Sequence, residues 1–321
     1  MGGKRLERFL QDWMLPLAIV AGITLYLVYH YVPALHLAGG VLHVVASEGQ
    51  RIVIAILLFF QFVKVSPHDL RWQRWHGVAL IFQTLTFLVC SAFARVMPDG
   101  GGRILVECAM LCLICPTASA AGVITEKVGG DLAQTVTYLV MINVAATLLI
   151  PTVIPMVRPA ADLGFWQYVV RIALRIFPVL ILPCLLAWTI RYTTHRLQRM
   201  LMRWSRYSFY VWGVGLTLAM VLSTRALVLS RLGAGTILCI VLVSVACCAV
   251  QFWFGRHSCK GRIHRLTAGQ ALGQKNTGFL IWLGYNYLTP VTSVAGGLYA
   301  IWQNLYNAWE LHQAQETDKK Q

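Results

Sequence analysis

The sequence predicts an all-α integral membrane protein, and its composition is the first reason. Of its 321 residues, 58% are hydrophobic and only 12% are charged, whereas a soluble domain carries about 25% charged residues. A soluble chain of this length needs a more polar surface, and lipid is the solvent that tolerates this composition. The second reason is that the apolar residues recur in runs of about 20, the length that crosses a bilayer.

The apolar runs predict about ten transmembrane helices. They cover residues 14–33, 49–66, 75–97, 103–128, 132–157, 165–190, 207–229, 233–254, 267–288 and 290–312. The first run is interpreted as a retained span rather than a signal peptide, because no small-residue cleavage site follows it. The segment 34–48 is too short and too rich in His and Gly for a span of its own. It is either a surface helix or the start of the second span.

The basic residues predict how the helices are oriented. The chain has 27 Lys and Arg against 12 Asp and Glu, an excess that nucleic-acid-binding proteins also show. Here the basic residues lie between apolar runs, as they do in cytoplasmic loops, and they concentrate on the side of the N-terminus. We therefore expect a multi-pass protein of the cell inner membrane, with both termini cytoplasmic and no nucleic-acid partner.

The two halves of the chain, 1–160 and 161–321, are predicted to be repeats of five helices each. The segments CPTASAAG (115–122) and GQKNTGF (273–279) each lie within a span. About 26 residues after each comes a polar position in the next span, Asn143 in the first half and Gln303–Asn304 in the second. An odd number of spans per half gives the halves opposite orientations, the inverted-repeat plan of many secondary transporters.

Pro116 is predicted to interrupt the fourth span. Proline lacks a backbone donor and clashes with the preceding turn, and small or polar residues follow it up to Gly122. The thirteen residues from Arg103 correspond to about 20 Å of helix, a little beyond the middle of a 30 Å hydrocarbon core. The break is either a packing kink or irregular backbone that lines a cavity.

Lys275 lies in a polar run within the otherwise apolar ninth span. Ten residues separate it from Arg265, about 15 Å of helix, which places it near the midplane. A lysine there costs at least about 2.5–3.5 kcal/mol and is functional by default. The alternative is that the span begins later and Lys275 is interfacial, but the remaining 32 residues to Leu311 are then too few for two spans.

Two interrupted helices that cross near the midplane direct their broken ends at one point. Helix N-termini favour anions, and helix C-terminal carbonyls favour cations. A binding site for substrate or ion is therefore expected at the crossing. Its predicted residues are Pro116, Thr117, Ser119, Asn143, Gln274, Lys275, Asn276 and Thr277.

These segments resemble the bile acid:sodium symporter family. CPTASAAGVITEKVGGDLAQTVTYLVMINVAATLLIP resembles its broken fourth helix and its fifth helix, and AGQALGQKNTGFL resembles its ninth. The sharp motifs cover about a fifth of the chain. The resemblance implies a panel of helices 1, 2, 6 and 7, a core of helices 3–5 and 8–10, substrate bound between them, and alternating access by movement of core against panel.

The chain departs from the family where the family binds sodium. The family's ninth helix typically reads Glu-x-x-x-Gln-Asn; matched on Asn276, its Glu falls on Ala271 and its Gln on Lys275. The family's Ser-Asn in the fourth helix becomes Ser119-Ala120. Thr135 and Gln83 match further family ligands loosely. An acidic ligand is thus replaced and a cation is added, so sodium coupling is not expected.

Three other charged residues have two interpretations each. Glu107, about four residues inside the outer end of the fourth span, either carries a coupling proton, since lipid favours a neutral acid, or is interfacial. Lys275 is a second possible proton carrier. Arg171 and Arg175, one turn apart in the sixth span, either line an anion path or extend to the membrane surface.

The combined prediction is secondary transport of a small organic anion that does not require sodium. The alternative coupling is a sodium-coupled symporter. A membrane enzyme is not expected, because no catalytic Ser/His/Asp or His/Glu cluster is present. A sensor or scaffold on a transporter fold usually carries a soluble domain, and about ten residues follow the last predicted span. No cofactor and no resident metal are expected beyond a coupling sodium ion or proton.

Overall fold

The computed structural model is helical throughout the part of the chain that it describes. It describes the backbone of residues 2–230 and 232–319, and their side chains apart from those of 2–12, 37–38, 41–43 and 315–319. Within these residues no β-strand forms, and one isolated β-bridge is present. The prediction of an all-α protein is confirmed.

The helices follow one another with short connections. The first half of the chain forms α1 (Gly2–Tyr31), η1 (Pro33–Ala38), α2 (Gly39–Lys64), η2 (Pro67–Asp69), α3 (Arg74–Val96), α4 (Gly101–Ile114), α5 (Ala121–Lys127) and α6 (Leu132–Val157), where η denotes a 3-10 helix. The second half forms α7 (Phe165–Leu180), α8 (Leu182–Thr193), α9 (His195–Trp204), η3 (Ser205–Tyr207), α10 (Ser208–Ser230), α11 (Ala234–His257), α12 (Arg262–Gly273), α13 (Thr277–Tyr287), η4 (Pro290–Thr292) and α14 (Ser293–Lys319).

Several of these helices are suited to a membrane. Six are long and apolar enough to cross one: Trp13–Tyr31, Val44–Lys64, Arg74–Val96, Leu132–Val157, His195–Ser230 and Ala234–His257. The pair α7 and α8 makes a seventh if it counts as one span bent by 41°. Pro178 in α7 and Pro183 at the start of α8 account for this bend. The chain thus has the helices of a multi-pass membrane protein.

The second helix begins earlier than the sequence predicts. After the 3-10 helix η1, α2 starts at Gly39 rather than near residue 49. Most of the segment 34–48 is therefore the start of the second long helix. Its glycines and histidines weaken the apolar signal without preventing helix formation.

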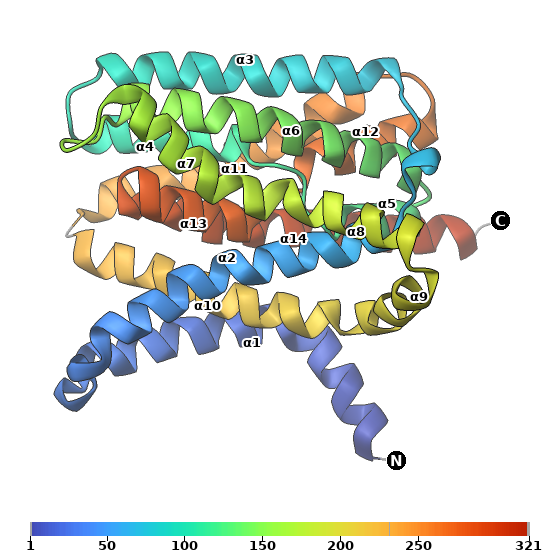
Figure 1. Cartoon of the computed structure of the whole chain (residues 1–321), viewed down its shortest axis with the longest axis horizontal. Helices are drawn as coiled ribbons and strands as arrows, with labels where there is room; N and C mark the ends of the chain where they lie inside the picture. Colours follow the sequence, from blue (N-terminus) through green and yellow to red (C-terminus); the bar gives the residue numbers. More distant parts are fainter. Residues whose placement is uncertain (1, 231, 320–321) are drawn as a thin grey trace.

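The basic segment after α8, which lies between two predicted spans, forms a helix rather than a loop. It is α9, and none of its residues is buried. Figure 1 shows α9 at the same end of the molecule as the start of α1 and the end of α14. The side chains of Lys4, Arg5, Arg8, Lys319 and Lys320, which contribute to the orientation prediction, lie outside the described residues.

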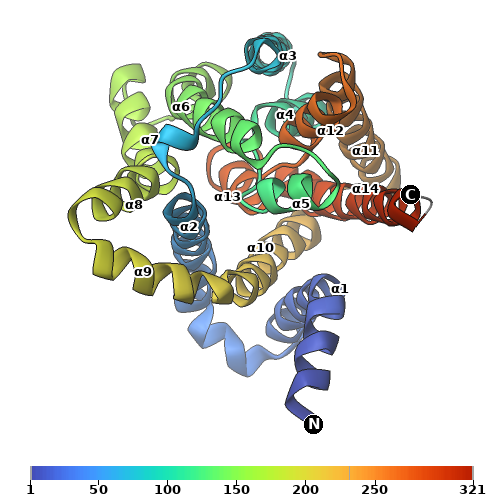
Figure 2. The ribbon, with the colours of Figure 1, turned by 90° about the vertical axis from the view of Figure 1, so that its right-hand side faces the viewer.

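The long helices run side by side and form two groups. Figure 2, viewed along the bundle, shows α1, α2, α8, α9 and α10 towards one side and α3, α4, α6, α11 and α12 towards the other. Within the first group α10 packs against both α1 and α2, and within the second α11 packs against α4, α12 and α14. Helix α13 contacts α2 and α10 as well as α14, so it lies where the groups meet.

Candidate functional site

Both predicted interruptions are present in the structure. Helix α4 ends at Ile114, and the chain becomes helical again only at Ala121. Helix α12 ends at Gly273, and α13 begins at Thr277. The first break follows from Pro116, which cannot donate to the preceding turn. The second break contains the polar residues 274–277, which interrupt an otherwise apolar stretch of the sequence.

The two breaks pair with each other through their backbones. Thr117 and Lys275 form an isolated antiparallel β-bridge. Two hydrogen bonds define it: Ala118 N–H donates to Gln274 O at 3.0 Å, and Asn276 N–H donates to Pro116 O at 2.8 Å. These bonds satisfy backbone groups that leave the helices, as buried backbone requires. We call the paired segments 115–118 and 274–277 the crossover.

Side chains tie the crossover to its surroundings. The Thr117 hydroxyl donates to Ala271 O at 2.7 Å, and the backbone N–H of Lys275 donates to Gln303 Oε1 at 2.8 Å. Gln83 donates from Nε2 to Cys115 O at 3.0 Å. Gln303 thus lies at the crossover, where the sequence pattern predicts a polar group. Gln83 also lies there, where the family resemblance implies one.

Two further residues cap the broken helices and are absent from the sequence prediction. The Tyr299 hydroxyl donates to Gly273 O at 2.7 Å, at the end of α12. Gln251 Nε2 lies 3.1 Å from Cys112 O, near the end of α4, and 3.0 Å from the Tyr299 oxygen. A lone glutamine in the apolar run 233–254 was the available signal for Gln251. Tyr299 has no distinguishing pattern in the sequence.

Lys275 is fully buried at the crossover, and its ammonium group has no hydrogen-bond partner among the described residues. The carbonyls of the broken helices and the Thr117 hydroxyl bond to one another, to glutamine side chains and to Tyr299 rather than to Lys275. Its electrostatic neighbours are instead the thiols of Cys112, Cys115, Cys247 and Cys248. An unpaired polar group at such a position is costly, which indicates a role other than stability.

The remaining predicted residues divide between the crossover and other places. Asn276 accepts from Phe279 N–H at 3.2 Å and so caps α13, of which Thr277 is the first residue. Asn143 is buried, and neither its side-chain oxygen nor its nitrogen has a described partner. Thr135 bonds to Thr125 at 3.2 Å, against α5 rather than in the crossover.

Gln274 begins a chain of buried polar groups that leads away from the crossover. Its side chain donates to Gln270, Gln270 donates to Glu310 of α14, and Glu310 pairs with Arg256 at the end of α11. Ser119 is only partly buried, and no hydrogen bond of its side chain joins it to the other predicted residues. The crossover therefore unites Pro116, Thr117 and residues 274–277 with Gln83.

Glu107 is fully buried within the protein, close to the loop that joins α3 and α4. Its carboxylate lies 2.7 Å from Arg158 and 3.4 Å from Arg103, and it accepts from Thr289 N–H at 3.2 Å. The carboxylate is therefore held between two guanidinium groups, an arrangement that favours a structural role. In the adjacent loop a hydrogen bond from Arg158 lowers the pKa of Asp99, and the charge of Arg158 adds to this effect.

Arg171 and Arg175 line a cavity between α2 and α7. Its volume is about 800 Å³, and Glu48 and Arg51 of α2 lie on the opposite wall. A second cavity of about 390 Å³ shares Glu48, Arg171 and Arg175 and extends to Trp282 and Asn286 of α13. The arginines therefore face a cavity, as an anion path requires.

Cysteine and metal chemistry add no second site in the described part of the chain. All nine cysteines are free thiols. No group of three or more His, Cys, Asp or Glu side chains there is arranged to hold a metal ion.

No protein-family model matches the sequence, and no curated protein matches it significantly. The function of the protein is therefore inferred from the geometry of the crossover and of the cavities beside it.

Proposed function

We propose that the protein is a secondary active transporter that moves a small organic anion by alternating access. The observation that carries this proposal is the backbone bridge between Thr117 and Lys275, which joins two interrupted helices from opposite halves of the chain. Interrupted helices that meet inside a bundle form the binding sites of many secondary transporters. A packing kink would not explain why both breaks occur at the same place.

The transporter is proposed to have ten spans in two inverted repeats. This count takes α4 with α5, α7 with α8, and α12 with α13 each as one interrupted span, and adds α14 to the remaining long helices. Five spans then fall in 1–160 and five in 161–321, and both termini lie at one end of the bundle (Figure 1). The positive-inside rule assigns that end to the cytoplasm of the inner membrane. Reporter fusions after Gln313 and in the loop 98–102 should give opposite signals.

The two groups of helices support a panel and a core that move against each other. The proposed panel is α1, α2, α7 with α8, and α10, and the proposed core is the rest of the spans. The larger cavity lies between the panel helices α2 and α7, and the smaller one extends from them to α13 of the core. This arrangement corresponds to the panel and core of the bile acid:sodium symporter family, which the crossover segments resemble.

Lys275 is proposed to replace the coupling cation. An ammonium about 4 Å from a sodium ion repels it by about 4 kcal/mol at an effective dielectric constant near 20. That energy corresponds to a roughly thousandfold loss of affinity. A buried lysine without a partner either releases a proton during the cycle or stays charged and attracts an anionic substrate. Both routes give transport that does not require sodium.

The test is uptake of radiolabelled organic anions by proteoliposomes. Succinate, benzoate and taurocholate are suitable probes, with sodium replaced by potassium or choline and with protein-free liposomes as background. We expect uptake of at least one anion whether sodium, potassium or choline is the cation in the buffer. Lys275→Gln should lose this uptake. Uptake that collapses without sodium while Lys275→Gln stays active would disprove the coupling, and no uptake of any organic anion would argue against transport.

A further inference from the structure

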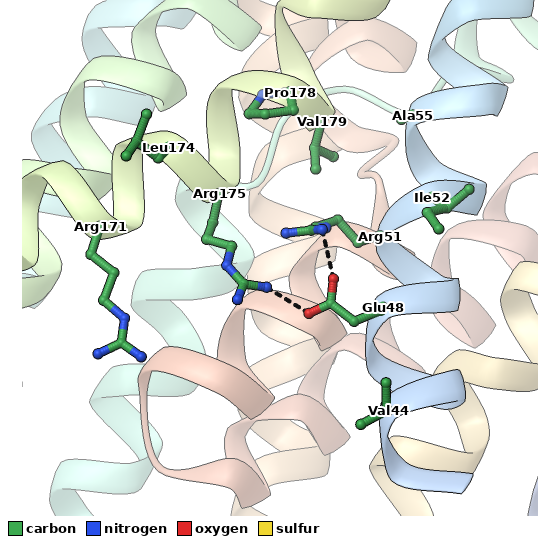
Figure 3. Close-up of a pocket in the computed structure, with 10 residues that line it drawn as sticks. All are labelled: Val44, Glu48, Arg51, Ile52, Ala55, Arg171, Leu174, Arg175, Pro178 and Val179. Atoms are coloured by element: carbon green, nitrogen blue, oxygen red, sulfur yellow. Dashed lines mark hydrogen bonds and ion pairs between the residues drawn. The ribbon is translucent and has the colours of Figure 1, made fainter. Parts of the chain in front are cut away.

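Three arginines converge on the larger cavity, accompanied by one acid. Arg171 and Arg175 project from successive turns of α7, and Arg51 projects from α2 opposite them (Figure 3). Glu48, one turn before Arg51, is the acidic residue that lines the cavity. The formal charge of these four side chains is three positive minus one negative, a net charge of +2.

Glu48 is already occupied by two of the arginines. Its Oε2 lies 2.6 Å from Arg51 Nη2, and its Oε1 lies 2.6 Å from Arg175 Nη1. Arg171 forms no ion pair or hydrogen bond with any residue whose side chain is described, and Figure 3 shows it extending beside Arg175. Arg171 and the remaining donors of Arg175 are therefore available to a ligand.

The smaller cavity continues from these arginines to an aromatic wall. It is lined by Tyr168 of α7 and by Trp282 and Tyr287 of α13. Two other residues that line the smaller cavity are already engaged: Ser47 Oγ donates to Asn286 Oδ1 at 3.1 Å, and Asn286 Nδ2 donates to Trp282 O at 2.7 Å. The wall thus offers ring surface, while the arginines offer charge.

We propose that the two cavities bind an organic dianion, a compact molecule with two acidic groups on an apolar or aromatic body. A guanidinium pair recognises a carboxylate through paired N–H donors, and aromatic side chains accept the body. Two negative charges neutralise the net +2 of the cavity, whereas a monoanion leaves one positive charge uncompensated. This inference rests on the proposed transport function and specifies its substrate class.

The test compares dianions with matched monoanions by calorimetric titration of the purified full-length protein. The protein is held in nanodiscs of phosphatidylcholine alone, and the probes are phthalate against benzoate and succinate against butyrate. We expect at least one dianion to bind tenfold or more tightly than its monoanion, because one charge-assisted contact contributes a factor of that order. In Arg171→Gln this preference should disappear. Arg95→Gln, which removes an exposed arginine of α3 that lines neither cavity, should leave it unchanged.

Equal binding of dianions and monoanions, no binding of either, or an unchanged preference in Arg171→Gln would overturn the inference. A second set of nanodiscs containing phosphatidylglycerol separates a free ligand from a lipid headgroup. Arg171-dependent binding of that lipid without any binding of the soluble dianions would also overturn it. If a monoanion is taken up but no dianion binds, the protein is a transporter and only the proposed substrate class is refuted. If a dianion binds but no anion is taken up, the proposed transport function is refuted.

Discussion

The backbone N–H of Asn276 donates a hydrogen bond to the carbonyl oxygen of Pro116 at 2.8 Å, although about 160 residues separate them in the chain. Each residue provides the hydrogen-bond partner that the backbone group of the other requires. The carbonyl of Pro116 has left α4 and needs a donor, and the N–H of Asn276 precedes α13 and needs an acceptor. The bond therefore fixes the two interrupted helices relative to each other at the proposed binding site.

Loss of the Asn276 side chain should weaken the start of α13. Its Oδ1 accepts from Phe279 N–H at 3.2 Å, and replacing such an N-cap by alanine costs about 1 kcal/mol. We expect Asn276→Ala to lower the unfolding temperature of the purified protein. Asn276→Ser retains an N-cap acceptor and should lose less stability. Equal losses in the two variants would show that the cap is not the cause.

The positions of both interruptions could be predicted because their residues conflict with the local pattern. Proline disfavours a helix interior, and although α6 continues through Pro151 and Pro155, Pro116 is followed by small and polar residues that do not restore the helix. Lys275 stands in an apolar run, so both positions are visible without knowledge of their neighbours. The early start of α2 stayed one of two alternatives, and the surface helix α9 was missed, for the opposite reason. Glycine, histidine and arginine obscure the apolar pattern there, although the backbone is helical.

The partners across helices could not be predicted in the same way. Tyr299 bonds to Gly273 and Gln251 lies close to Cys112 O because of how α11 and α14 pack against the broken helices. No spacing within either helix encodes these contacts. Glu107 pairs with Arg103 one turn earlier in α4, but its shorter ion pair joins it to Arg158 after α6. That second contact is not visible in the sequence, which left the role of Glu107 undecided between two alternatives.

Glu107 should be required for stability. Its carboxylate compensates Arg158 and Arg103, whose side chains are 27% and 12% exposed. Removing one partner of a buried ion pair leaves uncompensated charge and costs about 3–5 kcal/mol. We expect Glu107→Gln to destabilise the protein by about 3 kcal/mol, near the lower limit because the arginines are partly exposed. The measurement is denaturant unfolding in detergent.

The matched control for Glu107→Gln is Glu48→Gln. Glu48 also pairs with two arginines, but its side chain is 34% exposed, and exposed pairs contribute no more than about 1 kcal/mol. A loss in Glu107→Gln as small as that in Glu48→Gln would contradict a structural role for the buried carboxylate. If Glu107→Gln kept its stability but lost the pH dependence of uptake, the proton-carrier interpretation would be restored.

Asp99 should contribute a small acid-sensitive part of the stability. Its pKa is lowered from the ordinary value of 3.8, first by the hydrogen bond from Arg158 and then by the charge of that arginine. A carboxyl whose pKa is lower in the folded state stabilises the fold above its unfolded pKa, and this contribution is lost as the pH falls through the folded pKa. Wild type should therefore lose more stability than Asp99→Asn below about pH 4. Parallel unfolding temperatures from pH 5 to pH 3 would refute this.

Lys275→Met should make the protein more stable and less active at the same time. The ammonium group is fully buried and lacks a hydrogen-bond partner among the described residues. An unsatisfied buried group costs about 1–3 kcal/mol, and methionine occupies a similar volume without this cost. We expect a higher unfolding temperature for Lys275→Met and loss of anion uptake, the trade-off typical of a residue retained for function.

Lys64→Met is the control that shows whether the gain in stability is specific to position 275 or follows from any Lys→Met substitution. Lys64 ends α2 and is exposed, so its replacement should change the unfolding temperature much less than that of Lys275. If Lys275→Met is instead destabilised, the lysine must have partners in the membrane-embedded protein, such as ordered water, that offset its burial. If Lys275→Met is stabilised but transports normally, the charge at the crossover has no part in the cycle, and the coupling would have to be sought along the buried chain from Gln274 to Glu310.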